Sequence, residues 1–191
     1  MPLIARFDRV VAGRQRRSRV LARILVTACA LSLFPGAGRS AGNDLDEYQV
    51  KAAFLFNFAK FVAWPDHGST GPLVVGIVGE DPFGDAIDRV VRGKTINGRG
   101  IVIRRHNRGD DIRTSHVVFI SASEGRHVPE ILLRARGAAV LTVGETEDFL
   151  RDGGLVRFFI EGNRVRFDIN ADAAGAAGLK IKSQLLSLAK R

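Results

Sequence analysis

Few residues in this 191-residue chain have the types and the spacing that catalysis requires. Residues 38–42 (GRSAG) match the G-x-S-x-G pattern of a serine-hydrolase elbow. That elbow requires a buried strand before the serine, and no such strand is predicted before these residues. Residues 76–79 (GIVG), with Gly84 five residues later, lack the spacing of a dinucleotide-binding or phosphate-binding loop. We interpret this second segment as an ordinary turn from a strand to a helix.

The side chains that could bind a metal or act as acids and bases are also dispersed. No two histidines are three or four residues apart, and the single cysteine, Cys29, falls in the first 40 residues. Two acidic clusters, Asp110-Asp111 and residues 145–148, are interpreted as solvated or helix-capping charges, with acid–base catalysis as the weaker alternative. We therefore predict no catalytic, cofactor-binding or metal-binding residues, and no enzyme activity. The four histidines are His67, His106, His116 and His127.

The net charge of +9 is concentrated at one end of the chain. The first 40 residues hold eight Arg and one Asp, which leaves 21 basic and 19 acidic side chains, a net of +2, in residues 41–191. A nucleic-acid-binding surface needs a strong positive field, so this near balance argues against nucleic acid as a partner.

Residues 1–40 have the organisation of a cleaved signal peptide. A basic region is followed by an apolar run from Ile24 to Phe34 and then by the helix-breaking Pro35 and small residues. A membrane-anchoring helix is the alternative, and a lipid anchor at Cys29 is disfavoured because Arg23 leaves almost no apolar core before it. We predict export to the periplasm and one domain over residues 41–191.

The remaining chain alternates short apolar runs with helical segments. We predict strands at 73–78, 117–121 and 139–143, and hairpins over 94–105 and 155–169 around Asn97-Gly98 and Gly162-Asn163. Helices are predicted at 47–63, 84–91, 128–136, 145–150 and 172–190, the last one interrupted at Gly178 in an alternative interpretation. This order predicts an α/β layered domain with a mixed β-sheet flanked by helices.

The aromatic residues of the predicted helix 47–63 are spread around the helix and do not form one narrow stripe. Because successive helical residues rotate by about 100°, its phenylalanines cover more than half of the circumference. Such a helix either packs on several sides within its own monomer or shares a face with a second copy. For the second interpretation we hypothesise a dimer face at Phe54, Phe58 and Phe61.

Several segments in a fixed order resemble the YfiR-like family. They are residues 48–58 (YQVKAAFLFNF) continuing to Phe61 and Trp64-Pro65, 75–79 (VGIVG) with 81–84 (DPFG), 118–121 (VFIS), 140–143 (VLTV), 163–170 (NRVRFDIN), and 177–183 (AGLKIKS) with Leu185-Leu186. The resemblance covers essentially all of residues 47–190. The chain departs from the family pattern at Ser115, because the family often has a cysteine before the histidine of its central strand. Disulfide-based control is therefore not expected in this chain.

The resemblance implies a dimeric periplasmic regulator with an α/β fold. Its expected partner is a membrane-bound diguanylate cyclase or another inner-membrane sensor, and repression of a cyclase would lower cyclic di-GMP. A periplasmic small-ligand-binding protein is the alternative. The resemblance does not supply contact positions, so we hypothesise a partner surface from the polar and aromatic residues of the last hairpin and the segment after it. These residues are Phe159, Glu161, Asn163, Arg164, Arg166, Asp168, Asn170 and Lys180.

Overall fold

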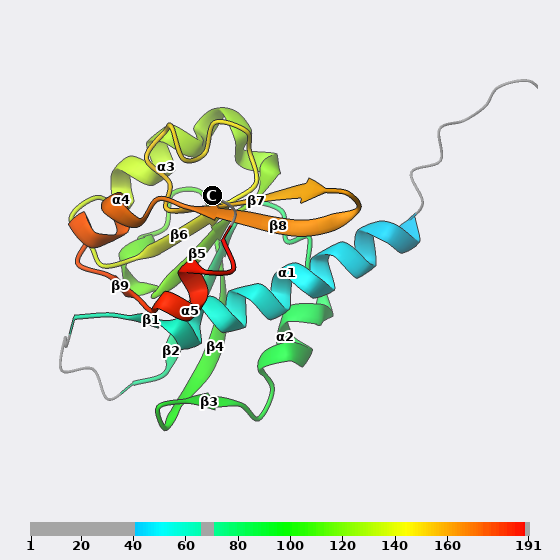
Figure 1. Cartoon of the computed structure of the whole chain (residues 1–191), viewed down its shortest axis with the longest axis horizontal. Helices are drawn as coiled ribbons and strands as arrows, with labels where there is room; N and C mark the ends of the chain where they lie inside the picture. The colour runs from blue at the N-terminus through cyan, green and yellow to red at the C-terminus, as the bar shows by residue number, and fades with distance from the viewer. Residues whose placement is uncertain (1–40, 66–70, 190–191) are drawn as a thin grey trace, which may run out of the picture. The chain divides into compact units, whose positions relative to one another are not determined.

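The computed structural model describes residues 41–65 and 71–189, and the predicted signal peptide lies outside them. Most of the described chain surrounds one seven-stranded sheet (Figure 1). In spatial order its strands are β3 (Thr95–Ile96), β4 (Arg99–His106), β2 (Leu73–Val78), β5 (Val117–Ile120), β6 (Leu141–Gly144), β7 (Val156–Glu161) and β8 (Arg164–Ile169). Among these described residues, no helix is long and apolar enough to cross a membrane.

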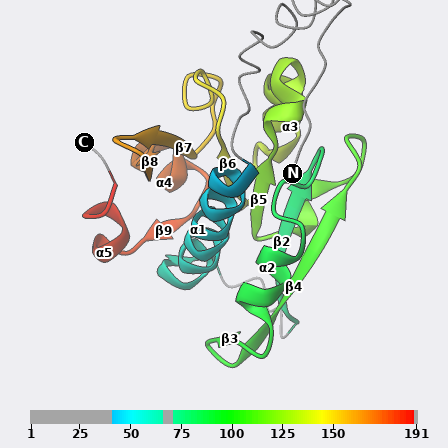
Figure 2. The same cartoon turned by 90° about the vertical axis from the view of Figure 1, so that its right-hand side faces the viewer.

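The sheet is parallel at its centre and antiparallel at both ends. Strands β4, β2, β5, β6 and β7 are parallel neighbours, whereas β3 and β8 pair antiparallel with β4 and β7. Figure 2 shows β4 and β8 on opposite sides of this array. The central strands β2 and β5 are buried along their whole length, as expected for parallel strands covered on both faces. The prediction of a mixed sheet is confirmed.

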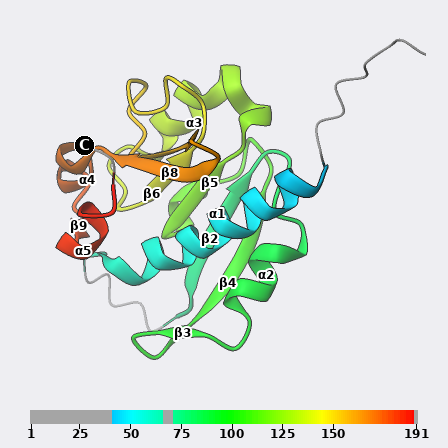
Figure 3. The same cartoon turned by 45° about the vertical axis from the view of Figure 1, so that its right-hand side comes forward.

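Helices cover both faces of the sheet. They are α1 (Ala41–Phe61), α2 (Asp85–Val91), α3 (Val128–Ala135), α4 (Ala171–Ala176) and α5 (Ser183–Leu186), with short 3-10 turns at η1 (Ile112–Thr114) and η2 (Ala122–His127). The larger core cluster contains buried residues of α1, α2, α4 and α5, and the smaller contains those of α3. Figure 3 shows α1 running along the β7–β8 hairpin. The layered α/β class is therefore confirmed.

Both predicted hairpins are present with the turn residues that the sequence indicated. Asn97 and Gly98 have φ of 52° and 77°, and Gly162 and Asn163 have φ of 54° and 60°. Two consecutive left-handed residues match the right-handed twist of the flanking strands, which is why Asn and Gly occupy these positions. The second turn fixes the register of β7 against β8, with Glu161 opposite Arg164.

The predicted helix at 145–150 is wrong, because this segment forms turns instead. Its apolar residue Phe149 is fully buried and lies against two glycines. A Cβ atom at Gly144 or Gly154 would overlap with the Phe149 ring. The chain therefore folds around this ring rather than continuing as a helix.

The prediction of one long helix at 172–190 is also wrong, and the alternative with a break at Gly178 is confirmed. Gly178 has φ of 78°, and the chain continues as the short strand β9 (Lys180–Ile181) before α5. Strand β9 pairs antiparallel with β1 (Val62–Ala63), the two residues after α1. This small second sheet joins the end of α1 to the C-terminal segment.

The phenylalanines of α1 pack mainly inside the monomer. Phe58 has no exposed surface, and its ring lies 5.6 Å from Phe158 and 5.1 Å from Phe167. Phe58 is therefore excluded from the hypothesised dimer face, because no part of it reaches the surface. Phe54 and Phe61 are half-buried, and their role in a dimer stays a prediction.

Candidate functional site

The β7–β8 hairpin has one apolar face and one polar face. The paired positions Phe158 and Phe167 are buried against α1. The alternate positions on both strands project to the other side, since successive side chains of a strand point in opposite directions. These polar-face residues are Arg157, Phe159 and Glu161 on β7 and Arg164, Arg166 and Asp168 on β8.

Interactions across this polar face hold its side chains in place. Arg157 donates from Nη2 to Asp168 Oδ2 at 2.8 Å and from Nη1 to the Glu147 carbonyl oxygen at 3.0 Å. Its guanidinium also lies 5.3 Å from the centre of the Phe159 ring. Arg166 is 3.9 Å from Glu161, a longer and weaker ion pair.

The structure brings together six of the eight hypothesised partner residues, if the turn residue Asn163 is included. Asn170 instead accepts a hydrogen bond from Ala173 N–H at 3.0 Å and caps α4. Lys180 lies on β9, in the separate two-stranded sheet. The sequence interpretation did not include Arg157, although its alternation with Phe159 and Glu161 places it on the same face.

A buried ion cluster lies where α1 crosses the carboxyl edge of the parallel strands. Lys51 Nζ is 2.5 Å from both Glu47 and Glu145, and the Lys51 side chain is only 4% exposed. The Tyr48 hydroxyl donates to Glu145 at 3.1 Å. The interpretation of Glu145 as a solvated or helix-capping charge is therefore wrong, because it compensates a buried ammonium group.

These residues line a shallow cavity of about 450 Å³ beside the hairpin. Its wall includes Tyr48, Lys51 and Glu145 together with Arg157 and Phe159 of the polar face. The carboxyl edge of the sheet and the polar face of the hairpin therefore form one continuous surface.

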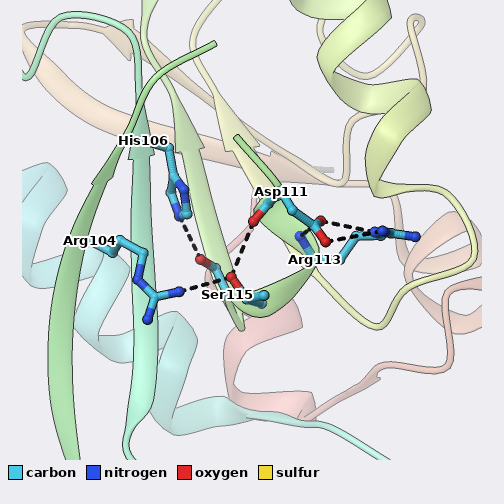
Figure 4. Close-up of polar contacts among 6 residues, drawn as sticks. Arg104, His106, Asp111, Arg113 and Ser115 are labelled. Atoms are coloured by element: carbon cyan, nitrogen blue, oxygen red, sulfur yellow. Dashed lines mark hydrogen bonds and ion pairs between the residues drawn. The ribbon is translucent and has the colours of Figure 1, made fainter. Parts of the chain in front are cut away.

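His106 and Ser115, which sequence reasoning left apart, form a buried pair on the face of the sheet that points away from α1 (Figure 4). His106 Nε2 is 3.0 Å from Ser115 Oγ, and the two residues are 7% and 3% exposed. Gly76 on the intervening strand β2 permits this contact, because a Cβ atom there would lie 2.9 Å from both His106 and Ser115. Ser115, the position at which the resemblance suggested a cysteine, thus presents a hydroxyl to His106.

The pKa values of His106 and of nearby Asp111 are shifted by their surroundings. Burial, with a smaller contribution from Arg104, lowers the pKa of His106 below its usual 6.5. Hydrogen bonds from the Arg113 side chain and backbone lower the pKa of Asp111 to about 2. Among the described residues, no carboxylate hydrogen-bonds to His106, so the orienting acid of a catalytic triad is not present there.

A cleft of about 820 Å³ lies at the opposite, amino edge of the parallel strands. It is bordered by the starts of β2 and β5, the end of α1 and the residue after β9. Its charged lining consists of Lys60, Arg99, Arg113 and Lys182, with Asp111 as the one carboxylate among the described lining residues. Trp64 and His116 also line it, and the indole N–H donates to the His116 carbonyl oxygen at 3.1 Å.

The chain belongs to the YfiR/HmsC-like family, whose sequence profile matches residues 48–190. The match includes all the elements described above except the first residues of α1. Proteins of this family are periplasmic regulators that interact with membrane signalling proteins, and they are not known as enzymes.

Among solved structures, the chain is similar to the ABC domain in complex with L-Trp from Streptococcus pneumonia. The two sequences are 9% identical with a TM-score of 0.49. The similar region covers 75% of this chain and 59% of that chain, so this protein spans less than two thirds of that chain's length.

Proposed function

We propose that this protein is an exported periplasmic regulator that binds the periplasmic part of an inner-membrane diguanylate cyclase and represses it. Family membership over residues 48–190 is the observation that carries the proposal. A binder that prefers the inactive state of the cyclase shifts its population towards that state without any chemistry of its own. The consequence is a lower concentration of cyclic di-GMP in the cytoplasm.

The polar face of the β7–β8 hairpin is the proposed partner surface. It presents arginines beside an aromatic ring, a combination enriched at protein interfaces. The buried pair Phe158 and Phe167 packs against the Phe54 and Phe58 rings of α1, which restrains the hairpin. A restrained surface loses less entropy on association.

A pull-down with the purified periplasmic part of the cyclase tests this surface. Arg164→Ala and Asp168→Ala should each weaken binding, whereas Arg92→Ala, an exposed residue after α2, should not. If both hairpin variants are folded and bind as well as the wild type, the proposed surface is wrong.

The proposed homodimer has a separate test. With Phe58 enclosed, the half-buried Phe54 and Phe61 are the remaining candidates for the face between copies. Phe54→Glu should then convert a dimer to a monomer in a size measurement. A soluble Phe54→Glu variant that stays dimeric would remove this residue from the interface.

A further inference from the structure

We infer that the outer edge of β4 is a docking site for an extended acidic segment of another protein, which would add a strand to the sheet. This inference goes beyond the proposed regulatory function, because β4 lies on the opposite side of the strand array from the β7–β8 hairpin (Figure 2). It rests on the open edge of the strand, on the side chains along that edge and on their charge.

Most of β4 is paired along only one of its two edges. Residues 101–106 pair in parallel with β2, whereas β3 on the other side reaches only Arg99 and Gly100. Within the described ranges 41–65 and 71–189, no strand or backbone hydrogen bond covers the outer edge of 101–106. Alternate residues of a strand direct their N–H and C=O groups to opposite edges, so about half of these residues present both groups outward. The open edge has the usual length of a strand in globular proteins.

The side chains along this edge fit a neighbouring strand of alternating character. Ile101 and Ile103 are half-buried on the face that packs against the larger core cluster. Val102 and Arg104 point to the opposite face, where Val102 is 43% exposed. An added strand would cover the isoleucines with apolar side chains on one face and place a side chain beside Arg104 on the other.

The charge of this part of the chain indicates that the added strand is acidic. Residues 89–109 contain seven Arg and Lys and no Asp or Glu. Arg105 and Arg108 are already paired with carboxylates of other segments. Arg104 is exposed and donates to the neutral Thr114 hydroxyl at 2.9 Å, and no carboxylate of the described residues forms an ion pair with it. A carboxylate beside Arg104 would form the opposite-charge pair that stabilises neighbouring strands.

The same charge argues against a second copy of this chain as the occupant. Two β4 edges paired about a two-fold axis would bring Arg104 and Arg105 of both copies into one short ladder. Like charges at neighbouring positions destabilise such a ladder, and exposed charges on edge strands commonly prevent self-association. The edge therefore selects against its own copies and for an acidic segment that binds by strand addition.

Synthetic peptides and the purified protein test this inference. The probe is a fluorescein-labelled peptide of sequence Thr-Glu-Val-Glu-Val-Glu-Thr, which alternates acidic and apolar side chains as a strand with two different faces does. One control peptide has lysine in place of every glutamate. A second has proline in place of both valines, which keeps the charge but prevents a regular strand ladder. Fluorescence anisotropy measures binding, and amide hydrogen exchange locates it.

The expected result is saturable binding of the acidic peptide and little binding of either control. Amide exchange should slow within residues 101–106, because outward N–H groups become hydrogen-bonded, and should stay unchanged in β7 and β8. Arg104→Glu should weaken binding of the acidic peptide at least about fivefold and strengthen binding of the lysine peptide. Arg136→Glu, at an exposed residue after α3, makes the same change of charge and should bind like the wild type.

Absence of saturable binding by the acidic peptide overturns the inference. So does equal binding of the proline peptide, which would indicate attraction to any anionic chain or surface without strand addition. A folded Arg104→Glu variant that binds the acidic peptide as tightly as the wild type also overturns it. These measurements use neither the cyclase nor a hairpin variant, so their failure leaves the regulatory proposal untouched, and the reverse also holds.

Discussion

The two edges of the parallel strands differ in how their charges are balanced. At the carboxyl edge each described cluster matches cations with carboxylates, as in Lys51 with Glu145, Arg105 with Asp81 and Arg108 with Glu124. At the amino edge, Arg113 pairs with Asp111 and Arg99 donates to the backbone carbonyl oxygens of Gly71 and Pro72. Lys60 and Lys182 are exposed there. Lys51 at the carboxyl edge is therefore buried with its carboxylate partners, whereas Lys60 and Lys182 at the amino edge are exposed to solvent.

The largest expected effect lies in the buried cluster of the carboxyl edge. Lys51→Met leaves Glu145 buried without its ammonium partner, so the free energy of unfolding should fall by about 3 kcal/mol. Urea denaturation measures this change. The matched control is Lys60→Met, an exposed lysine of the same helix at the other edge, which should change stability by less than about 0.5 kcal/mol. Equal effects of the two substitutions would contradict the contrast between the edges.

A second, smaller effect is expected at Gly76. In Gly76→Ala the new methyl group would lie 2.9 Å from His106 and Ser115, so packing strain should cost about 1–3 kcal/mol. Gly100→Ala on the neighbouring strand β4 is the control, since a methyl group added there would meet nothing within 4 Å. Thermal unfolding of both variants is the measurement. A fully stable Gly76→Ala variant would show that His106 and Ser115 are not held against β2.

Acidification should also destabilise the protein through His106. The folded state lowers its pKa, so below about pH 6.5 the unfolded chain binds a proton more readily than the folded chain. This effect is absent above that pH and grows as the pH falls towards the lower, folded-state pKa. The decline in melting temperature over this range should be smaller in His106→Gln. An equal decline in both proteins would assign the acid sensitivity to other groups.

The smallest effect is expected on the polar face of the hairpin. Arg157 and Asp168 are each 25% exposed, so solvent screens their ion pair. A double-mutant cycle with Arg157→Ala and Asp168→Ala should give a coupling of no more than about 1 kcal/mol. A much larger coupling would mean that this face stabilises the fold, which would weaken its assignment as a partner surface.

Local patterns in the sequence predicted those features that depend on neighbouring residues. The Asn-Gly and Gly-Asn turns predicted both hairpins, because positive φ is encoded in the two turn residues themselves. The alternation of polar and apolar residues in 164–169 is likewise a local pattern, and it matches the polar face observed on β8. The break at Gly178 could be anticipated for the same local reason.

Features formed by distant residues were not predictable in this way. Lys51 and Glu145 are 94 residues apart, and their pairing follows from the crossing of α1 over the sheet. His106 and Ser115 meet only because β4 and β5 flank β2 and Gly76 has no side chain. The helix predicted at 145–150 failed because burial of Phe149 between two glycines outweighs local helix preference.

The central claim is that the polar face of the hairpin represses a diguanylate cyclase, and cyclic di-GMP measured in cells tests it most directly. A strain lacking this protein should contain more cyclic di-GMP, and both the wild type and Arg92→Glu should restore the lower level. The Phe159→Ala/Arg166→Glu variant, exported in equal amount, should leave the level high. Full restoration by this hairpin variant, or an unchanged level in the deletion strain, would contradict the account.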